Sequence, residues 1–213
     1  MKLLMISKRN WLQNTTKLIA SLAIYTPVTA IFTACAEKKL EFKSVDITGA
    51  DYAKDFAADG TMLDHNGTPR SIKDFAGKIV VVFFGFVQCP DVCPTTMVEL
   101  AEVKKLLGKD GDKLQALFIT IDPDRDTLPV LKAYMANFDP TFLAMRTTPD
   151  KLVILAKDFK TYYKKAPGRT DTSYSMDHSA GSFVYDTTGK VRLYTRYGSG
   201  AEALASDIKL LLK

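Results

Sequence analysis

Two cysteines separated by three residues lie in the run Cys89-Pro90-Asp91-Val92-Cys93-Pro94, and the third cysteine of the chain lies far upstream at position 35. An apolar run rich in β-branched residues, 79–87, comes directly before them. In open α/β folds a buried strand of this kind places the residues after it at the carboxyl edge of the sheet, where ligands bind. Pro94 suits a first helical position, so we expect Cys93 beside a helix N-terminus, whose partial positive charge favours the thiolate. Such a pair can exchange disulfides or hold a soft metal ion.

The spacing of the pair narrows the kind of site. Thioredoxin-type redox pairs have two intervening residues, whereas three intervening residues put the sulfur atoms one turn apart on a common face if the segment is helical. Because no second cysteine pair follows, a zinc or iron–sulfur site with four sulfur ligands is excluded. Any metal at this pair must therefore recruit a ligand other than sulfur.

The chain has two histidines that could supply such a ligand. His65 lies in Asp64-His65-Asn66-Gly67, a composition typical of hairpin turns, and we expect it to be a solvated turn residue. His178 comes shortly before the apolar run 182–185, where a loop residue can reach the end of a neighbouring strand. Position alone favours a hydrogen-bonded loop histidine slightly over a ligand.

Three blocks of the chain resemble the signature blocks of the Sco/SenC family: residues 85–96 around the cysteine pair, Thr120-Ile121-Asp122-Pro123-Asp124-Arg125-Asp126-Thr127, and Asp177-His178-Ser179. The resemblance extends over roughly residues 42–212. It implies an α/β, thioredoxin-like fold that binds one copper ion, as Cu(I) or Cu(II), through Cys89, Cys93 and His178. It also implies a metallochaperone rather than an enzyme, which assembles the CuA centre in the copper-bearing subunit of cytochrome c oxidase. Another copper chaperone or a thiol reductase would be a second partner.

Two other functional classes use the same cysteines. A thiol–disulfide reductase would cycle Cys89 and Cys93 through a disulfide to keep the cysteines of a partner reduced, without a metal. A thiol peroxidase would use Cys93 as the peroxidatic thiol. The peroxiredoxin pattern, however, requires Pro and Thr where this chain has Phe86 and Pro90, which argues against the peroxidase. The reductase remains the alternative to the metallochaperone.

Composition and charge limit the domain count and the partners. A chain of 213 residues with 46% apolar content is long enough for one ordinary α/β domain. The formal net charge of +5 would suit a nucleic-acid partner, but four of the 29 basic residues precede residue 35, where there is no acidic residue. The rest of the chain has 25 basic against 24 acidic residues, so we expect no nucleic-acid partner.

Residues 1–35 are predicted to be a signal peptide, lipoprotein leader or membrane anchor. A basic stretch ends at Lys17 and a mostly apolar run, 18–34, leads to Cys35. Small residues before a cysteine resemble the lipobox of bacterial lipoproteins, although Phe32 stands where leucine is usual. An uncleaved helix is the alternative, since residues 18–36 approach the roughly 20 that span a bilayer, although Pro27 weakens it. Either anchor would leave the domain in the periplasm, facing an oxidising compartment.

The rest of the chain is predicted to hold an extended approach segment, 36–57, and one thioredoxin-like domain, 58–213, in which a mixed central sheet is flanked by helices. A hairpin at 64–67 precedes a strand at 79–86. A helix is predicted to begin at Pro94 and to end at Gly108. Met97 belongs to the apolar stripe of this helix, so we expect it in the core. The acidic turn 122–127 is interpreted as helix capping and ion pairing. The other predicted elements are a strand at 114–121, helices at 128–138, 149–159 and 201–212, and a final hairpin at 182–196 that turns at 186–189.

The insertion 160–177 has little periodicity and is predicted to be a long loop, a mobile flap that brings His178 to the thiolates. Its tyrosines, Tyr162, Tyr163 and Tyr174, would present an aromatic surface to a partner. Asp177 is a candidate to orient the ring of His178 or to tune its basicity.

Overall fold

The computed structural model of this chain describes residues 40–52, 56, 62–170 and 173–213. The predicted leader, including Cys35, lies outside the described residues, as does much of the boundary between the approach segment and the domain. No helix in the described part of the chain has the length and apolar character needed to cross a bilayer.

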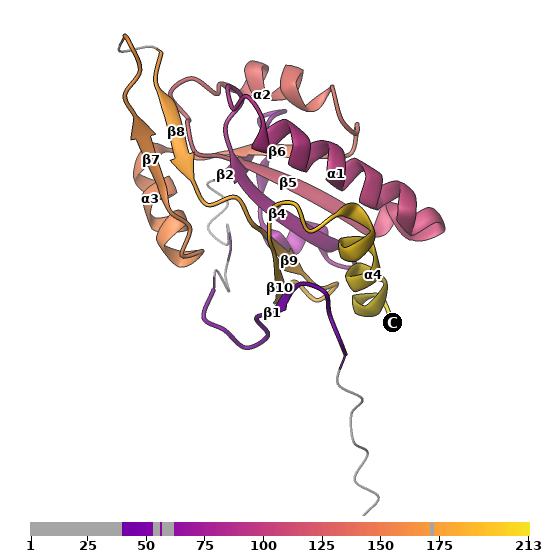
Figure 1. The fold of residues 1–213 in the computed structure, drawn as a ribbon. Helices are drawn as coiled ribbons and strands as arrows, with labels where there is room; N and C mark the ends of the chain where they lie inside the picture. Colours follow the sequence, from indigo (N-terminus) through magenta and orange to yellow (C-terminus); the bar gives the residue numbers. More distant parts are fainter. Residues whose placement is uncertain (1–39, 53–55, 57–61, 171–172) are drawn as a thin grey trace, which may run out of the picture. The chain divides into compact units, whose positions relative to one another are not determined.

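An eight-stranded mixed sheet forms the centre of the fold, in the order β1-β10-β9-β4-β5-β6-β2-β3 (Figure 1). Its middle strands, β4 (Ile79–Gly85) and β5 (Leu114–Thr120), pair in parallel, and every residue in both is buried. Strands buried on both faces need apolar residues throughout, which explains the continuous apolar runs of the sequence. The remaining strands are β1 (Val45–Asp46), β2 (Met62–Asp64), β3 (Pro69–Arg70), β6 (Leu143–Arg146), β9 (Ser182–Tyr185) and β10 (Val191–Thr195).

Helices cover the sheet. α1 (Val92–Leu107) follows β4 and packs against α4 (Ala201–Leu211), while α2 (Leu128–Met135) lies near β6 (Figure 1). The fourth α-helix is α3 (Pro149–Asp158), and two short 3-10 helices are η1 (Ile72–Phe75) and η2 (Gly108–Lys113). Met97, a residue of α1, is fully buried, which confirms that it belongs to the core.

The order of strands and helices agrees with the predicted thioredoxin-like arrangement, and most predicted elements occur within a few residues of their predicted bounds. Three details differ. Helix α1 begins at Val92, two residues before Pro94, so Cys93 lies inside its first turn. The approach segment contributes β1, which pairs with β10, and β6 was not predicted from the sequence.

The prediction of a long loop at 160–177 is wrong. The insertion contains β7 (Tyr163–Ala166) and most of β8 (Ser175–His178), an antiparallel hairpin that makes a sheet of its own (Figure 1). Met176 is the one buried residue of β8, and β7 has no buried residue. The alternation of apolar and polar residues that signals a half-buried strand is therefore almost absent from the sequence. In the register of this hairpin, Tyr163 lies opposite His178.

Candidate metal centre

Both cysteines lie at the carboxyl edge of the sheet, as predicted. After β4 the chain turns, with the backbone N–H of Cys89 donating to the carbonyl oxygen of Phe86 at 3.2 Å, and α1 then begins at Val92. The Sγ of Cys89 accepts the backbone N–H of Cys93 at 3.4 Å. The Cys89 sulfur therefore satisfies a backbone donor in the first turn of α1, which ties the two cysteines together.

The two thiols differ in burial. Cys93 is fully buried, whereas Cys89 is half-buried. Burial raises the pKa of the Cys93 thiol far above its usual value, because the thiolate loses its hydration, and the neighbouring Cys89 sulfur raises it further. The expectation that the helix N-terminus makes Cys93 a ready thiolate is thus wrong for the metal-free protein. A bound cation would supply the positive charge that stabilises a buried thiolate in place of water, and it would displace the thiol proton on binding.

Gly85, the last residue of β4, leaves the space that the Cys93 side chain occupies. A Cβ atom at this position would lie 2.9 Å from Cys93 Sγ and 2.7 Å from a ring carbon of Phe118. Both distances are shorter than real carbon contacts allow, so a side chain here would displace the sulfur or the ring. The glycine is therefore needed for the close approach of α1 to the sheet.

His178 ends β8 and points at the buried cysteine. Its Nε2 lies 3.7 Å from Cys93 Sγ, while its Nδ1 lies 2.8 Å from the carbonyl oxygen of Ser179. A carbonyl only accepts, so this contact puts the ring proton on Nδ1 and leaves the Nε2 lone pair free for a metal. Burial lowers the pKa of His178, which keeps the imidazole neutral and ready to ligate.

The immediate surroundings of the His178 ring fix its orientation. The rings of Phe83 and Phe86 both pack edge-on against it at centroid distances of 6.0 Å. The hydrogen-bonded partner is Ser179 and not Asp177, so the hypothesis that Asp177 orients the ring is not supported. The exposed Asp177 acts through its charge, which opposes the lowering of the His178 pKa.

The sequence-predicted donors therefore meet at one point. Each of the three residues, Cys89, Cys93 and His178, offers one ligand atom, and these three atoms lie within 4.8 Å of one another. Metal bonds to sulfur and nitrogen of roughly 2.0–2.3 Å place two ligands of one ion about 3.5–4 Å apart, which matches the distance between Cys93 and His178. Two sulfurs and an imidazole form a donor set suited to a soft ion such as copper.

His65 takes no part in this group. It lies in the turn between β2 and β3, and its Nδ1 accepts the backbone N–H of Ala144, a residue of β6, at 3.1 Å. His65 lies in a turn, as predicted, but it is half-buried and contacts β6, so the prediction of a solvated residue is wrong.

A cavity of about 320 Å³ opens beside the three donors. Its walls come from the turn before α1 and from β8, and include Cys89 and His178 but not Cys93. The lining residues are Phe86, Cys89, Pro90, Asp91, Val92, Ser175, Met176, Asp177, His178 and Ala180. Two of the three donors are thus accessible from one opening.

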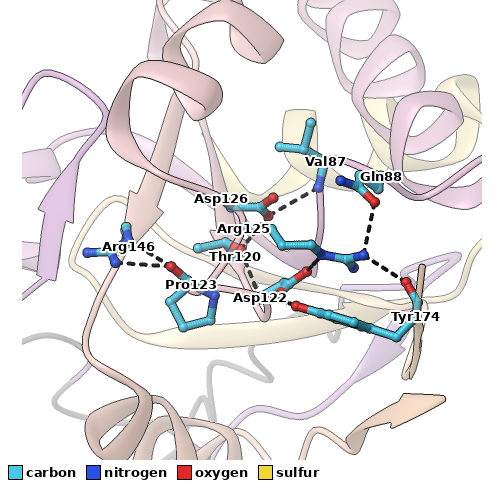
Figure 2. Close-up of polar contacts among 9 residues, drawn as sticks. All are labelled: Val87, Gln88, Thr120, Asp122, Pro123, Arg125, Asp126, Arg146 and Tyr174. Carbon is cyan, nitrogen blue, oxygen red and sulfur yellow. Dashed lines mark hydrogen bonds and ion pairs between the residues drawn. The ribbon is translucent and has the colours of Figure 1, made fainter. Parts of the chain in front are cut away.

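The acidic turn after β5 supports the cysteine turn through Asp126 (Figure 2). The buried Asp126 carboxylate accepts the hydroxyl of Thr120 at 2.6 Å and the backbone N–H of Val87 at 3.1 Å. The predicted ion pairing of this turn is confirmed by the contact between Arg125 and Asp122. The hydrogen-bond partners of Asp126 were not predicted from the sequence, although its place after a neighbouring parallel strand puts it at the same sheet edge as the cysteines.

Comparison with known proteins places these features in a family. The SCO1/SenC family model matches residues 48–213. "Protein SCO2 homolog, mitochondrial" of Mus musculus is 31% identical over 153 residues, which cover 71% of this chain and 60% of that protein. The SCO2-like protein of Rickettsia felis is 34% identical over 133 residues, 62% of this chain and 65% of the relative. The chain thus spans less than two thirds of the length of these relatives.

Solved structures of similar chains share the thioredoxin-like fold. Copper-bound ScoI of Bradyrhizobium japonicum is 36% identical, with a TM-score of 0.65 over 71% of this chain and 96% of that one. Copper-bound yeast Sco1 is 30% identical, with a TM-score of 0.63 over 70% of this chain and 83% of that one. The family model matches well over half of the sequence and includes all three donors of the site, and the chain therefore belongs to the SCO1/SenC family.

Proposed function

We propose that this protein is a copper metallochaperone that holds one copper ion through Cys89, Cys93 and His178 and takes part in assembling the CuA centre of cytochrome c oxidase. The observation that carries the proposal is the convergence of two sulfurs and one unprotonated ring nitrogen within 4.8 Å. The copper-bound relatives support the choice of metal. The copper-bearing oxidase subunit is the proposed acceptor, with another copper chaperone or a thiol reductase as a second partner.

The donor set explains how one site serves both copper states. Two thiolates are enough for Cu(I), whereas Cu(II) prefers nitrogen and depends more on His178. With two thiolates the centre has a net charge of −1 with Cu(I) and is neutral with Cu(II). A site that is neutral in one state and open to a cavity is suited to ligand exchange with an acceptor.

Copper uptake by the full-length chain in detergent tests the proposal. The reduced protein should bind one copper ion per chain, and oxidation to a Cys89–Cys93 disulfide should abolish binding because both sulfur ligands are lost. His65→Ala is the matched control, since that histidine lies outside the site, and should bind copper normally. Full copper binding by the disulfide form would refute the assignment.

The thiol–disulfide reductase is the second candidate, favoured by the proximity of the two free sulfur atoms. Cys89 would be its attacking thiol, because Cys93 is buried and holds its proton. His178→Ala separates the two functions: it should abolish maturation of the oxidase copper centre, yet leave reduction of a model disulfide within roughly a factor of ten, about 1.4 kcal/mol in barrier. Normal oxidase assembly by this variant would favour the reductase.

We also propose that the N-terminal segment anchors the domain to the bacterial cell membrane, with the domain in the periplasm. If Cys35 is lipidated, Cys35→Ser should remove acyl labelling and release the protein from the membrane fraction. Membrane association that persists, with no acyl label on the parent protein, would instead indicate an uncleaved helix.

A further inference from the structure

The position of His178 depends on a hairpin that, among the residues the structure describes, has no strand pairing with the main sheet. β7 and β8 form a separate two-stranded sheet, so contacts other than a β-ladder must place it against the domain. An isolated two-stranded hairpin is only marginally stable in water. The spacing of the metal ligands therefore depends on the side chains that connect β8 to the cysteine turn.

Arg125 makes such a connection (Figure 2). One nitrogen of its guanidinium, Nη1, donates to the carbonyl oxygen of Tyr174 at 2.7 Å and to Oε1 of Gln88 at 2.9 Å, while Nε pairs with Asp122. Tyr174 directly precedes β8, and Gln88 directly precedes Cys89. The guanidinium thus bridges the two segments that supply the accessible ligands.

Tyr174 strengthens the connection from the hairpin side. The guanidinium carbon of Arg125 lies 3.6 Å from the centre of its ring, and its hydroxyl donates to Asp122 at 2.7 Å. Lys165 of β7 places its Nζ 3.8 Å from the same ring. The tyrosine is buried, so these cation–π contacts lie in a partly desolvated setting, where they are strongest.

We propose that Arg125 is a positioning residue for the metal centre: it ties the hairpin to the cysteine turn and thereby sets the distance between His178 and the two thiols. A planar guanidinium can donate in several directions while stacking on a ring, which an ammonium cannot do. The inference rests on the proposed function, because it needs His178 to be a ligand.

The full-length reduced chain with Arg125→Gln tests this role. Arg146→Gln is the matched control, because the Arg146 guanidinium also binds the acidic turn, at the carbonyl oxygen of Pro123, but not the hairpin (Figure 2). We expect Arg125→Gln to weaken Cu(II) binding about tenfold or more, and Cu(I) binding less than about threefold, because Cu(II) depends on the imidazole. The nitrogen coupling in the Cu(II) electron paramagnetic resonance spectrum should decrease as well.

Two further readouts separate positioning from charge and from general destabilisation. In the metal-free protein, Arg125→Gln should speed hydrogen exchange in β7 and β8, and Arg146→Gln should not. Arg125→Lys keeps the charge but not the bridge, so it should behave like Arg125→Gln. Full recovery of Cu(II) binding by the lysine variant would overturn the inference.

A double-mutant cycle with His178→Ala decides whether Arg125 acts through the histidine. In the His178→Ala background, Arg125→Gln should change Cu(II) affinity by less than about threefold, since the positioned ligand is already absent. An undiminished effect would show that Arg125 does not act through His178. If the single variant His178→Ala binds Cu(II) with unchanged affinity, the proposed ligand set is wrong. If His178→Ala weakens Cu(II) binding but Arg125→Gln does not, the ligand set stands and the positioning role of Arg125 is wrong.

Discussion

The buried thiol of Cys93 and the missing side chain of Gly85 occupy one small volume at the end of β4. Gly85→Ala should therefore push the sulfur or the Phe118 ring out of place, since the new Cβ would lie within 3 Å of both. Overpacking of this kind typically costs about 1–3 kcal/mol. We expect a lower free energy of unfolding in urea together with weaker Cu(I) binding in a competition assay. Wild-type values for both would contradict the tight contact.

At the same scale, the cysteine pair was predictable from its own spacing, His178 was predicted as a ligand only through the family resemblance, and the protonation state of the donors was not predicted correctly. The cysteine spacing and the family resemblance pointed to Cys89, Cys93 and His178, which meet in the structure. The raised pKa of Cys93 was not predictable, because a local helix-terminus argument does not include the burial that dominates it. The bridging role of Arg125 was also hidden, since its partners Gln88 and Tyr174 are distant in sequence.

Among the elements, the β2–β3 hairpin depends on one buried carboxylate. Asp64 accepts the backbone N–H groups of Asn66 and Thr68 at 2.8 and 3.0 Å and pairs with Arg70 at 2.9 Å. Burial by itself would raise the pKa of Asp64, but the hydrogen bonds from Thr68, Arg70 and Asn66 outweigh it and lower the pKa.

The sign of this shift gives a prediction for acid stability. Because the folded-state pKa lies below the unfolded value of about 3.9, the contribution of Asp64 is fully present above that value and is lost as the pH falls through the folded pKa. Asp64→Asn should thus be less stable than the wild type at neutral pH, and the difference should shrink below about pH 4. Urea unfolding at several pH values measures this; a difference independent of pH would contradict it.

Predictability of the elements followed their length and their burial. β4, β5 and α1 carry long apolar patterns and were predicted to within two residues, although α1 begins earlier than the proline suggested. β1 has two exposed residues, and β7 has no buried one, so neither carries a hydrophobic signal. β1 forms by pairing with the distant strand β10, and β7 forms by pairing with β8, the next strand along the chain; a local hydrophobic pattern reports neither pairing.

For the molecule as a whole, one side chain joins the two ends of the described domain. Asp207 of α4 is fully buried and accepts the backbone N–H groups of Lys43 and Ser44 at 2.7 and 2.8 Å. Asp207→Ala should leave both donors without this partner and lower the free energy of unfolding by about 1–3 kcal/mol. Glu202→Ala, an exposed change on the same helix, is the control and should have little effect. Equal stability of the two variants in urea would argue against the link.

In the proposed metallochaperone, the unequal burial of the two thiols would give copper release a direction. An incoming ligand in the cavity meets Cys89 and His178 first, while Cys93 lies behind them, outside the cavity wall. In the reduced, metal-free protein, iodoacetamide should therefore alkylate Cys89 well before Cys93, which peptide mapping over time would show; equal rates would contradict this order. An acceptor would then replace the outer bonds one after another, and the bond to Cys93 would break last, so the ion is never free in solution during the transfer.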